Sequence, residues 1–296
     1  MGGSGGLRRV DERLGLAVLR TSLSGRSLVT YARDHVSVRT PSRPDFRDGN
    51  TLDLLAVPTP DDLERWTTRF DETIGVLGAR QARLRWEVPL PDDAPPAAPT
   101  PDPALRRAAD VLGLHLEPLT VLLLDELHAP PAAPVTIAPV PPPSAVDPQP
   151  TDRRWHAATV LYRYDADDVG DPERWRAWDE EFVAWSVDVQ RELATAERAQ
   201  VWVAQRHGAP VARATLVHDR QGLAAVEDVI VHPVHRGLGV AAALTHAAVT
   251  GHLHLEPDAR VGVGAEPGGR AEQIYRRLGF VPHATVWTAT GRHLRP

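Results

Sequence analysis

The stretch Val229-Ile-Val-His-Pro-Val-His-Arg-Gly-Leu-Gly-Val-Ala-Ala-Ala-Leu244 decides how the second half of this chain is interpreted. Its apolar start is typical of a β-strand, and its end, rich in alanine and leucine, is typical of a helix. Between the two lie Arg236, Gly237 and Gly239. Glycine lacks the β-carbon that would hold an anion away, and the first amides of a helix are unpaired donors at the positive end of its dipole. The pattern therefore predicts a pyrophosphate site, to which Arg236 can add a charge-assisted contact.

Strands and helices alternate on both sides of this stretch. In the second half, strands are expected at residues 211–217, 225–231, 260–264 and 285–288, and helices at residues 172–197, 237–250 and 269–277. In the first half, strands are expected at residues 35–39, 51–57, 83–88 and 119–124, and helices at residues 61–73 and 103–111. The strand and helix order matches, and Leu112-Gly113-Leu114 matches Leu278-Gly279-Phe280 as a helix stop. This correspondence indicates an internal duplication, although strand and helix alternation is also common in unrelated α/β proteins.

Proline and alanine dominate residues 129–150, which predicts a linker with a candidate short strand at residues 135–137. The predicted domains are therefore residues 7–128 and residues 151–296. A shorter proline-rich loop at residues 89–103 is interpreted as an insertion within the first domain.

Composition excludes several classes of function. The chain of 296 residues is 42% hydrophobic, with no apolar run long enough to cross a bilayer and no secretory signal pattern at its start, so we expect a cytoplasmic protein. Cysteine is absent, which excludes disulfides and thiol catalysis. The formal charge of −6 gives no broad reason to bind nucleic acid or an anionic membrane.

The glycine loop and its surroundings resemble the GNAT (N-acetyltransferase) superfamily. The signature of that family is Arg or Gln, two residues, Gly, one residue, then Gly or Ala, and Arg236, Gly239 and Ala241 fill it. Tyr275-Arg-Arg-Leu-Gly-Phe280 matches a second family segment, one strand and one helix later. The resemblance implies two GNAT-like α/β domains, each a mixed β-sheet flanked by helices, of which the first has lost its cofactor loop.

The resemblance also implies roles for individual residues. Acetyl-CoA or another acyl-CoA would be the co-substrate, and backbone groups of Val229 and Val231 would pair with its pantetheine arm. Its pyrophosphate would lie on the loop, which consists of Arg236, Gly237, Leu238, Gly239, Val240 and Ala241. Many family members carry an asparagine where this chain has Gly268, so that side-chain contact to the pantetheine arm is missing.

For catalysis, Tyr275 is the candidate acid, with packing or a bond to the cofactor as the alternative role. The candidate bases are Glu227 and Asp228, of which at most one is expected to line the cleft because adjacent residues on a strand face opposite ways. His232 and His235 are interpreted as solvated bystanders.

Several alternatives remain open at this stage. Gly237-Leu-Gly239-Val-Ala-Ala242 also fits a dinucleotide fingerprint with Glu256 as the ribose acid, although the glycines follow the strand only after a spacer. The acceptor is expected to be an amine of a small molecule or a peptide, while a non-catalytic acyl-CoA binder is the competing function. Trp175, Trp178 and Trp185 are interpreted as core residues on the acceptor side.

Metal binding and a second cofactor site are not expected. His252 and His254 are too sparse a pattern for a metal site, so no metal is predicted. The first half reads Val57-Pro58-Thr59-Pro60-Asp61-Asp62 at the position of the loop, which suits a helix start capped by Thr59 and opposes a pyrophosphate. The oligomeric state is not indicated by the sequence.

Overall fold

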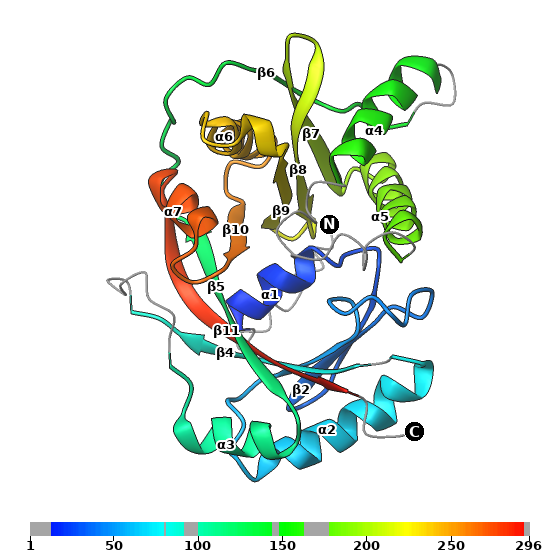
Figure 1. Cartoon of the computed structure of the whole chain (residues 1–296), viewed down its shortest axis with the longest axis vertical. Helices are drawn as coiled ribbons and strands as arrows, with labels where there is room; N and C mark the ends of the chain where they lie inside the picture. Colours follow the sequence, from blue (N-terminus) through cyan, green and yellow to red (C-terminus); the bar gives the residue numbers. More distant parts are fainter. Residues whose placement is uncertain (1–12, 80, 92–99, 144–147, 163–177, 293–296) are drawn as a thin grey trace, which may run out of the picture.

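The computed structural model describes residues 13–79, 81–91, 100–143, 148–162 and 178–292. Within these residues the strands form one eleven-stranded mixed sheet in the order β1-β2-β3-β4-β11-β5-β10-β9-β8-β7-β6 (Figure 1). The strands are β1 (Leu28–Tyr31), β2 (His35–Arg39), β3 (Thr51–Leu54), β4 (Gln81–Pro89), β5 (His115–Leu124), β6 (Thr136–Pro139), β7 (Ala199–Arg206), β8 (Ala209–His218), β9 (Leu223–Val231), β10 (Arg260–Ala265) and β11 (Phe280–Arg292).

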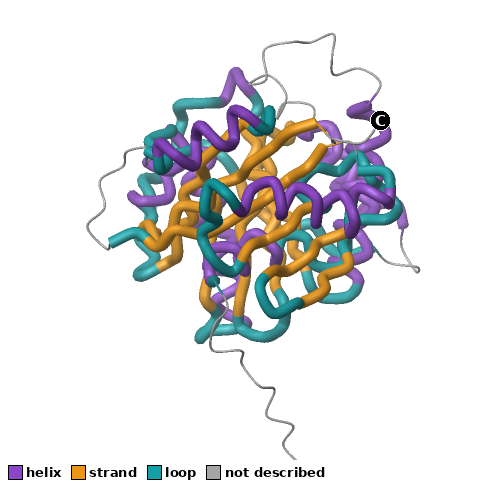
Figure 2. Tube along the Cα trace, turned by 90° about the horizontal axis from the view of Figure 1, so that it is seen from below, coloured by secondary structure: helices purple, strands orange, loops and turns teal. Residues whose placement is uncertain are grey.

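Helices cover both faces of this sheet, so that the strands lie enclosed between them (Figure 2). They are α1 (Leu14–Thr21), α2 (Asp62–Thr73), α3 (Pro103–Val111), α4 (Pro148–Tyr162), α5 (Trp178–Thr195), α6 (Val240–Leu255) and α7 (Arg270–Arg277), with short 3₁₀ turns η1 (Gly75–Leu77) and η3 (Pro233–His235). The mixed α/β fold expected from the sequence is confirmed.

The two halves repeat one order of elements. The series β2, β3, α2, β4, α3, β5 in the first half matches the series β8, β9, α6, β10, α7, β11 in the second. In each half the helix after the second strand connects it to a parallel neighbour, so that β3 runs parallel to β4 and β9 runs parallel to β10. Strand β2 and helix α3 have the predicted bounds, and most other elements differ by a few residues at their ends.

The last strands of the two halves are exchanged. Strand β5 of the first half lies between β10 and β11 of the second half, and β11 lies between β4 and β5 of the first half. Both strands are longer than expected, because each pairs along its length with strands of the other half that the local sequence does not reveal. Each half therefore completes the sheet of the other half.

Helix α1 was missed by the sequence analysis, and it lies across the middle of the sheet (Figure 1). Leu16 and Val18 of α1 pack against Val121, Ala225 and Val286, which belong to three central strands. A β-carbon on Gly262 would lie 2.4 Å from Val18 Cγ2, so glycine is needed where α1 approaches β10. A helix of the first half is thereby buried against strands of the second.

The faces of the second half follow from strand alternation. Arg213 of β8 points to α4 and α5, where it bonds to Ala158 O and Gln190 Oε1. Its neighbours Ala212 and Ala214 pack with α6 residues on the opposite face. Helices α1, α4 and α5 therefore share one face of this region, and α6 and α7 cover the other.

The stretch predicted as a linker contains structure. Strand β6 is an edge strand of the described sheet and pairs there only with β7. Its last residue, Pro139, is tolerated because no further strand of this sheet needs a hydrogen bond from its nitrogen. Helix α4 begins at Pro148, because proline in a first helical turn loses no hydrogen bond. Strands β1 and β7, like α1, are further elements that the sequence analysis missed.

Candidate active site

Strands β9 and β10 separate near their C-terminal ends. Their parallel pairing ends at Val226 and Val263, whereas β9 stays paired with β8 as far as Val231. Beyond Val226 the edge of β9 that faces β10 is therefore outside the ladder, and its backbone donors and acceptors need other partners. Val229 and Val231, which were predicted to pair with an extended ligand, lie on this stretch.

A β-bulge lies at the same place. Between the pairs Thr215–Glu227 and Arg213–Ile230, β9 advances three residues while β8 advances two. Asp228 is the extra residue of this bulge. Its φ is 50°, a left-handed conformation that aspartate tolerates better than most residues. The bulge interrupts alternation, so Glu227 and Asp228 both approach the face covered by α1, α4 and α5. The expectation that the two residues face opposite ways is wrong for this reason.

Asp228 is held by a network from three elements. Its Oδ2 accepts a hydrogen bond from the hydroxyl of Tyr162, at the end of α4, and one of 2.7 Å from Gln190 Nε2 of α5. Arg213 Nη2 of β8 lies 3.7 Å from the same oxygen, and its guanidinium is fully buried. The Asp228 side chain remains 18% exposed. Sequence reasoning missed Tyr162, Gln190 and Arg213, because no motif connects positions so far apart in the chain.

Glu227 has different surroundings. Burial raises the pKa of its carboxyl to about 8, and the negative charge of Asp228 acts in the same direction. Arg26 and a hydrogen bond from Ser22 favour the charged form and lower this pKa, but by less. Both residues follow α1 in the first half, so the first half contributes to the surroundings of this carboxyl. Glu227 is thus a weak acid that titrates near neutral pH, whereas Asp228 is a strongly bonded acceptor.

Tyr275 lies on the opposite face, on α7. Its ring is buried in the core formed by β9, β10, α6 and α7, with its centroid 5.9 Å from that of Phe280. Burial raises the pKa of its hydroxyl, and the charge of Glu227 raises it further. The hydroxyl is therefore protonated at neutral pH, as a proton donor must be. The ring also packs in the core, so the alternative packing role predicted for Tyr275 is present as well.

The glycine loop takes the shape that its composition allows. Gly237 and Gly239 have φ of 82° and 77°, and α6 begins only at Val240. The predicted start of this helix at Gly237 is wrong, because both glycines adopt left-handed conformations that end regular structure. No side chain caps α6, which leaves its first amides without a side-chain acceptor. The loop residues from Arg236 to Gly239 are exposed.

Two arginines lie beside this loop. Arg236 Nε donates a 3.1 Å hydrogen bond to the carbonyl of Val231, which ties the loop to the end of β9. Arg270, the first residue of α7, places Nη2 3.8 Å from the position of a β-carbon on Gly237. The sequence analysis did not predict Arg270. Helices α6 and α7 both begin beyond the C-terminal ends of β9 and β10, and these ends are neighbours only because the two strands run parallel.

The remaining candidates are histidines, of which His232 and His235 lie between β9 and the glycine loop. His232 Nδ1 accepts from Val234 N within the η3 turn, and its ring centroid is 5.6 Å from that of His235. His252 is buried against His218, whereas His254 is exposed, so the pair does not converge. Within the described part of the chain, no group of three or more histidine or acidic side chains is placed to hold a metal ion.

Of the three tryptophans predicted to be core residues, only the side chain of Trp185 is described. Trp185 packs against Phe46, with ring centroids 5.1 Å apart, and Arg43 lies over its ring. This contact joins α5 to the first half, in agreement with the core role predicted. Trp175 and the side chain of Trp178 lie outside the described residues.

The helix start of the first half differs from that of α6. Thr59 donates to Asp62 Oδ2 through its amide and its hydroxyl, at 3.1 and 2.7 Å. The predicted capping by Thr59 is therefore wrong in direction, because the carboxylate of Asp62 is the acceptor. The turn directly before α2, residues 55–61, contains no glycine.

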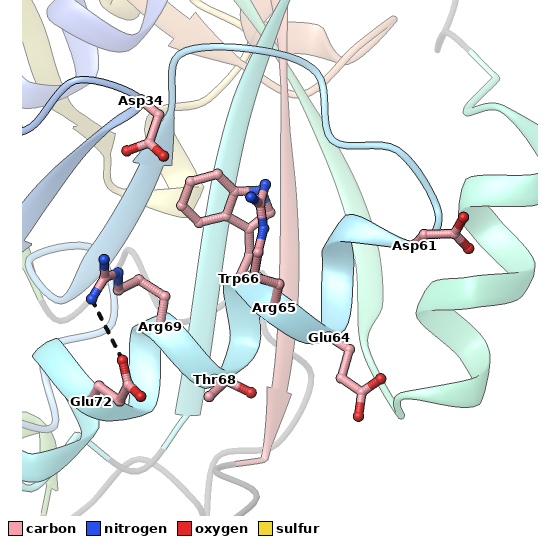
Figure 3. A pocket seen from close by; sticks show the side chains of 8 residues that line it. All are labelled: Asp34, Asp61, Glu64, Arg65, Trp66, Thr68, Arg69 and Glu72. Carbon is pink, nitrogen blue, oxygen red and sulfur yellow. Dashed lines mark ion pairs between the residues drawn. The ribbon is translucent and has the colours of Figure 1, made fainter.

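A cavity of about 580 Å³ lies along α2 in the first half. Figure 3 shows that its lining includes the carboxylates of Asp34, Asp61, Glu64 and Glu72, against the two guanidiniums of Arg65 and Arg69. Arg69 is already paired with Glu72 at 3.5 Å. This excess of negative charge opposes a pyrophosphate.

Comparison with known proteins agrees with this geometry. Residues 163–292 match the family model described as an acetyltransferase (GNAT) domain. Among solved structures, a GCN5-related N-acetyltransferase from Kribbella flavida is 20% identical with a TM-score of 0.58, over 96% of this chain and 97% of that one. A functionally unknown conserved protein from Staphylococcus epidermidis is 13% identical with a TM-score of 0.63, over 91% of this chain and 95% of that one.

A third solved structure has two such domains. It is a tandem GNAT protein from the clavulanic acid biosynthesis pathway, 17% identical with a TM-score of 0.52, over 83% of this chain and 76% of that one. A search of curated protein sequences gave no match. The second half of the chain thus matches the GNAT domain model, and the fold of the whole chain is similar to that of the tandem GNAT protein. The mixed sheet, with its exchanged strands, also excludes the doubly wound dinucleotide fold.

In the described residues no helix is long and apolar enough to span a bilayer.

Proposed function

We propose that this protein is an acetyl-CoA-dependent N-acyltransferase that acylates an amine of a small molecule or peptide. The observation that carries the proposal is the combination, at one end of β9, of a glycine anion loop, an opened strand edge and two adjacent carboxyls. The division of labour that we propose follows the predicted boundaries: residues 151–296 bind the cofactor and catalyse transfer, residues 129–150 connect the halves, and residues 7–128 bind no CoA.

The residues present fit an acyl-CoA. Two left-handed glycines and the uncapped start of α6 provide backbone donors for a pyrophosphate, with no β-carbon at either glycine to obstruct it. Residues Arg236 to Ala241 would hold this part, with Arg270 as a second cation. The edge of β9 at Val229 and Val231 offers backbone groups to the pantetheine arm. Bound acetyl-CoA would supply the acyl group as a thioester.

Glu227 is the better candidate for the base that removes the proton of the attacking amine. A general base works best with a pKa near the working pH, and that of Glu227 is raised to about 8. Asp228 already accepts bonds from Tyr162 and Gln190, so its role is to fix the position and charge of the site. The protonated hydroxyl of Tyr275 would give its proton to the leaving thiolate.

The experiment is an assay of free CoA release from acetyl-CoA across a panel of primary amines, combined with thermal unfolding with and without CoA. We expect CoA to raise the unfolding temperature and at least one amine to accelerate CoA release. A thermal shift without release for any amine would favour the alternative function, a non-catalytic acyl-CoA binder. Absence of the thermal shift would refute the cofactor assignment itself.

A further inference from the structure

The turn that follows α1 in the first half packs against α5 and influences the carboxyl of Glu227 in the second half. Gly25 has φ of 77°, and a β-carbon on it would lie 2.5 Å from Leu193 Cδ2 of α5. The turn is therefore pressed against α5, the helix that provides Gln190. Ser22, at the start of the turn, donates its hydroxyl to Leu19 O at 2.7 Å, and it also lowers the pKa of the Glu227 carboxyl. The turn is thus held against α5, and its residues Ser22 and Arg26 act on the pKa of the Glu227 carboxyl.

Arg26 lies on this turn and has guanidinium donors without acceptors. Its Nε and Nη2 atoms are buried, and neither has a hydrogen-bond partner among the described residues. Buried polar atoms are rarely left unpaired in folded proteins, because each costs the free energy of its lost hydration. Arg26 acts electrostatically on both Glu227 and Tyr162, so its unpaired donors belong to the surroundings of the candidate active site.

The carboxylates around Arg26 are engaged elsewhere. Asp228 has Tyr162, Gln190 and Arg213 as partners. The charge of Arg26 also lowers the pKa of Asp48. The carboxylate of Asp48, however, forms an ion pair of 2.8 Å with Arg83. Glu227 is mostly protonated at neutral pH because its pKa is raised. Among the described residues, no carboxylate therefore forms an ion pair with Arg26.

We propose that Arg26 binds a carboxylate of the acceptor, so that the acceptor is an amino acid or a similar amine with a carboxylate close to the amine. A guanidinium suits a carboxylate because its planar donors match the two oxygens. The amine would lie at Glu227 and Asp228, and the carboxylate at the turn of the first half. This inference rests on the proposed function and gives the first half a part in acceptor binding.

The test uses the full-length protein saturated with CoA and three matched pairs of amines. Each pair consists of an amino acid and its decarboxylated form: alanine and ethylamine, phenylalanine and 2-phenylethylamine, histidine and histamine. Binding is measured by calorimetry, and turnover with acetyl-CoA by release of free CoA. We expect at least one amino acid to bind about tenfold or more tightly than its partner, as one charge-assisted hydrogen bond implies. We expect Arg26→Ala to remove that difference and Arg26→Lys to restore part of it.

The controls separate this inference from the proposed function. Arg107→Ala removes an exposed arginine of α3 and should leave the discrimination unchanged. Thermal shifts by CoA should be equal in Arg26→Ala and the native protein, which shows that the variant is folded and binds its cofactor. Equal binding within all three pairs, binding of none of the amino acids, or an equal loss for both members of a pair in Arg26→Ala overturns the inference. Loss of the CoA shift in the native protein would instead refute the proposed function.

Discussion

At the scale of single residues, the left-handed backbone of Asp228 determines how the candidate carboxyls are arranged. It turns two neighbouring carboxyls to one face of the sheet, where helices from both halves surround them. Asp228 accepts hydrogen bonds, whereas burial raises the pKa of Glu227, so the two carboxyls have different surroundings. Placement of two acids in different environments is a general way in which proteins separate a base from a fixed charge.

Glu227 gives the first prediction, a pH dependence. Its pKa is raised to about 8, so the carboxyl is protonated below this pH and becomes a base as the pH rises through it. The value of kcat/KM should therefore rise from pH 6.5 to about pH 9 and then level off. Glu227→Gln should lower kcat/KM about 100-fold or more and abolish this rise. Steady-state kinetics over that pH range provide the measurement, with the exposed Glu192→Gln of α5 as the control. An unchanged profile in Glu227→Gln would assign the base elsewhere.

Tyr275 gives the second prediction. Tyr275→Phe keeps the buried ring beside Phe280 and removes the proton donor, so turnover should fall about tenfold or more while CoA affinity changes little. Single-turnover kinetics and calorimetry with CoA separate the two quantities. Native turnover in this variant would leave Tyr275 with only its packing role.

At the scale of elements, the proposed cofactor site depends on how α6 begins. Gly239→Ala adds a β-carbon at a left-handed position and should weaken CoA binding, and Arg236→Glu should do so more strongly through repulsion of the pyrophosphate. The measurement is the shift in unfolding temperature caused by CoA. Gly222→Ala is the matched control, because Gly222 is also left-handed with φ of 93° but lies in an open turn. Equal CoA shifts in all three variants would contradict the loop assignment.

At the scale of the whole molecule, the exchanged strands predict that the halves depend on each other. Strand β5 without β10 and β11 would leave two long edges unpaired. Residues 1–128 and 129–296 produced separately should therefore misfold or aggregate, and should form one complex when produced together. Size-exclusion chromatography and circular dichroism provide the measurements. As a control, the full chain with a protease site inserted at residues 129–134 should remain associated after cleavage. Two separately folded halves would show that the strand exchange is dispensable.

The final prediction concerns stoichiometry. The first half lacks the glycine loop and carries carboxylates along α2, so calorimetry of the intact protein should show one CoA site per chain. Gly239→Ala should weaken that single site without revealing a second. A second site of similar affinity would mean that the first half binds CoA after all.

The sequence by itself determined the local features of this protein. Short-range patterns predict the glycine loop and the strand-helix-strand unit around it. They also predict the repeated order of elements and the loss of the loop in the first half. These features depend on turn residues and on strand and helix periodicity, which involve only neighbouring residues. The prediction that Glu227 and Asp228 face opposite ways was wrong, since a bulge depends on the partner strand and not on the two residues alone.

Only the tertiary structure decided what lies around these features. The exchange of β5 and β11 joins positions 139 or more residues apart, and neither strand carries a local signal of its partner. The same exchange places α1 and its turn, with Ser22 and Arg26, beside the carboxyls of β9. Tyr162, Gln190 and Arg213 converge on Asp228 from separate elements. Burial and charge at the site are sums over such long-range contacts, which is why the pKa of Glu227 could not be inferred from its neighbours in the chain.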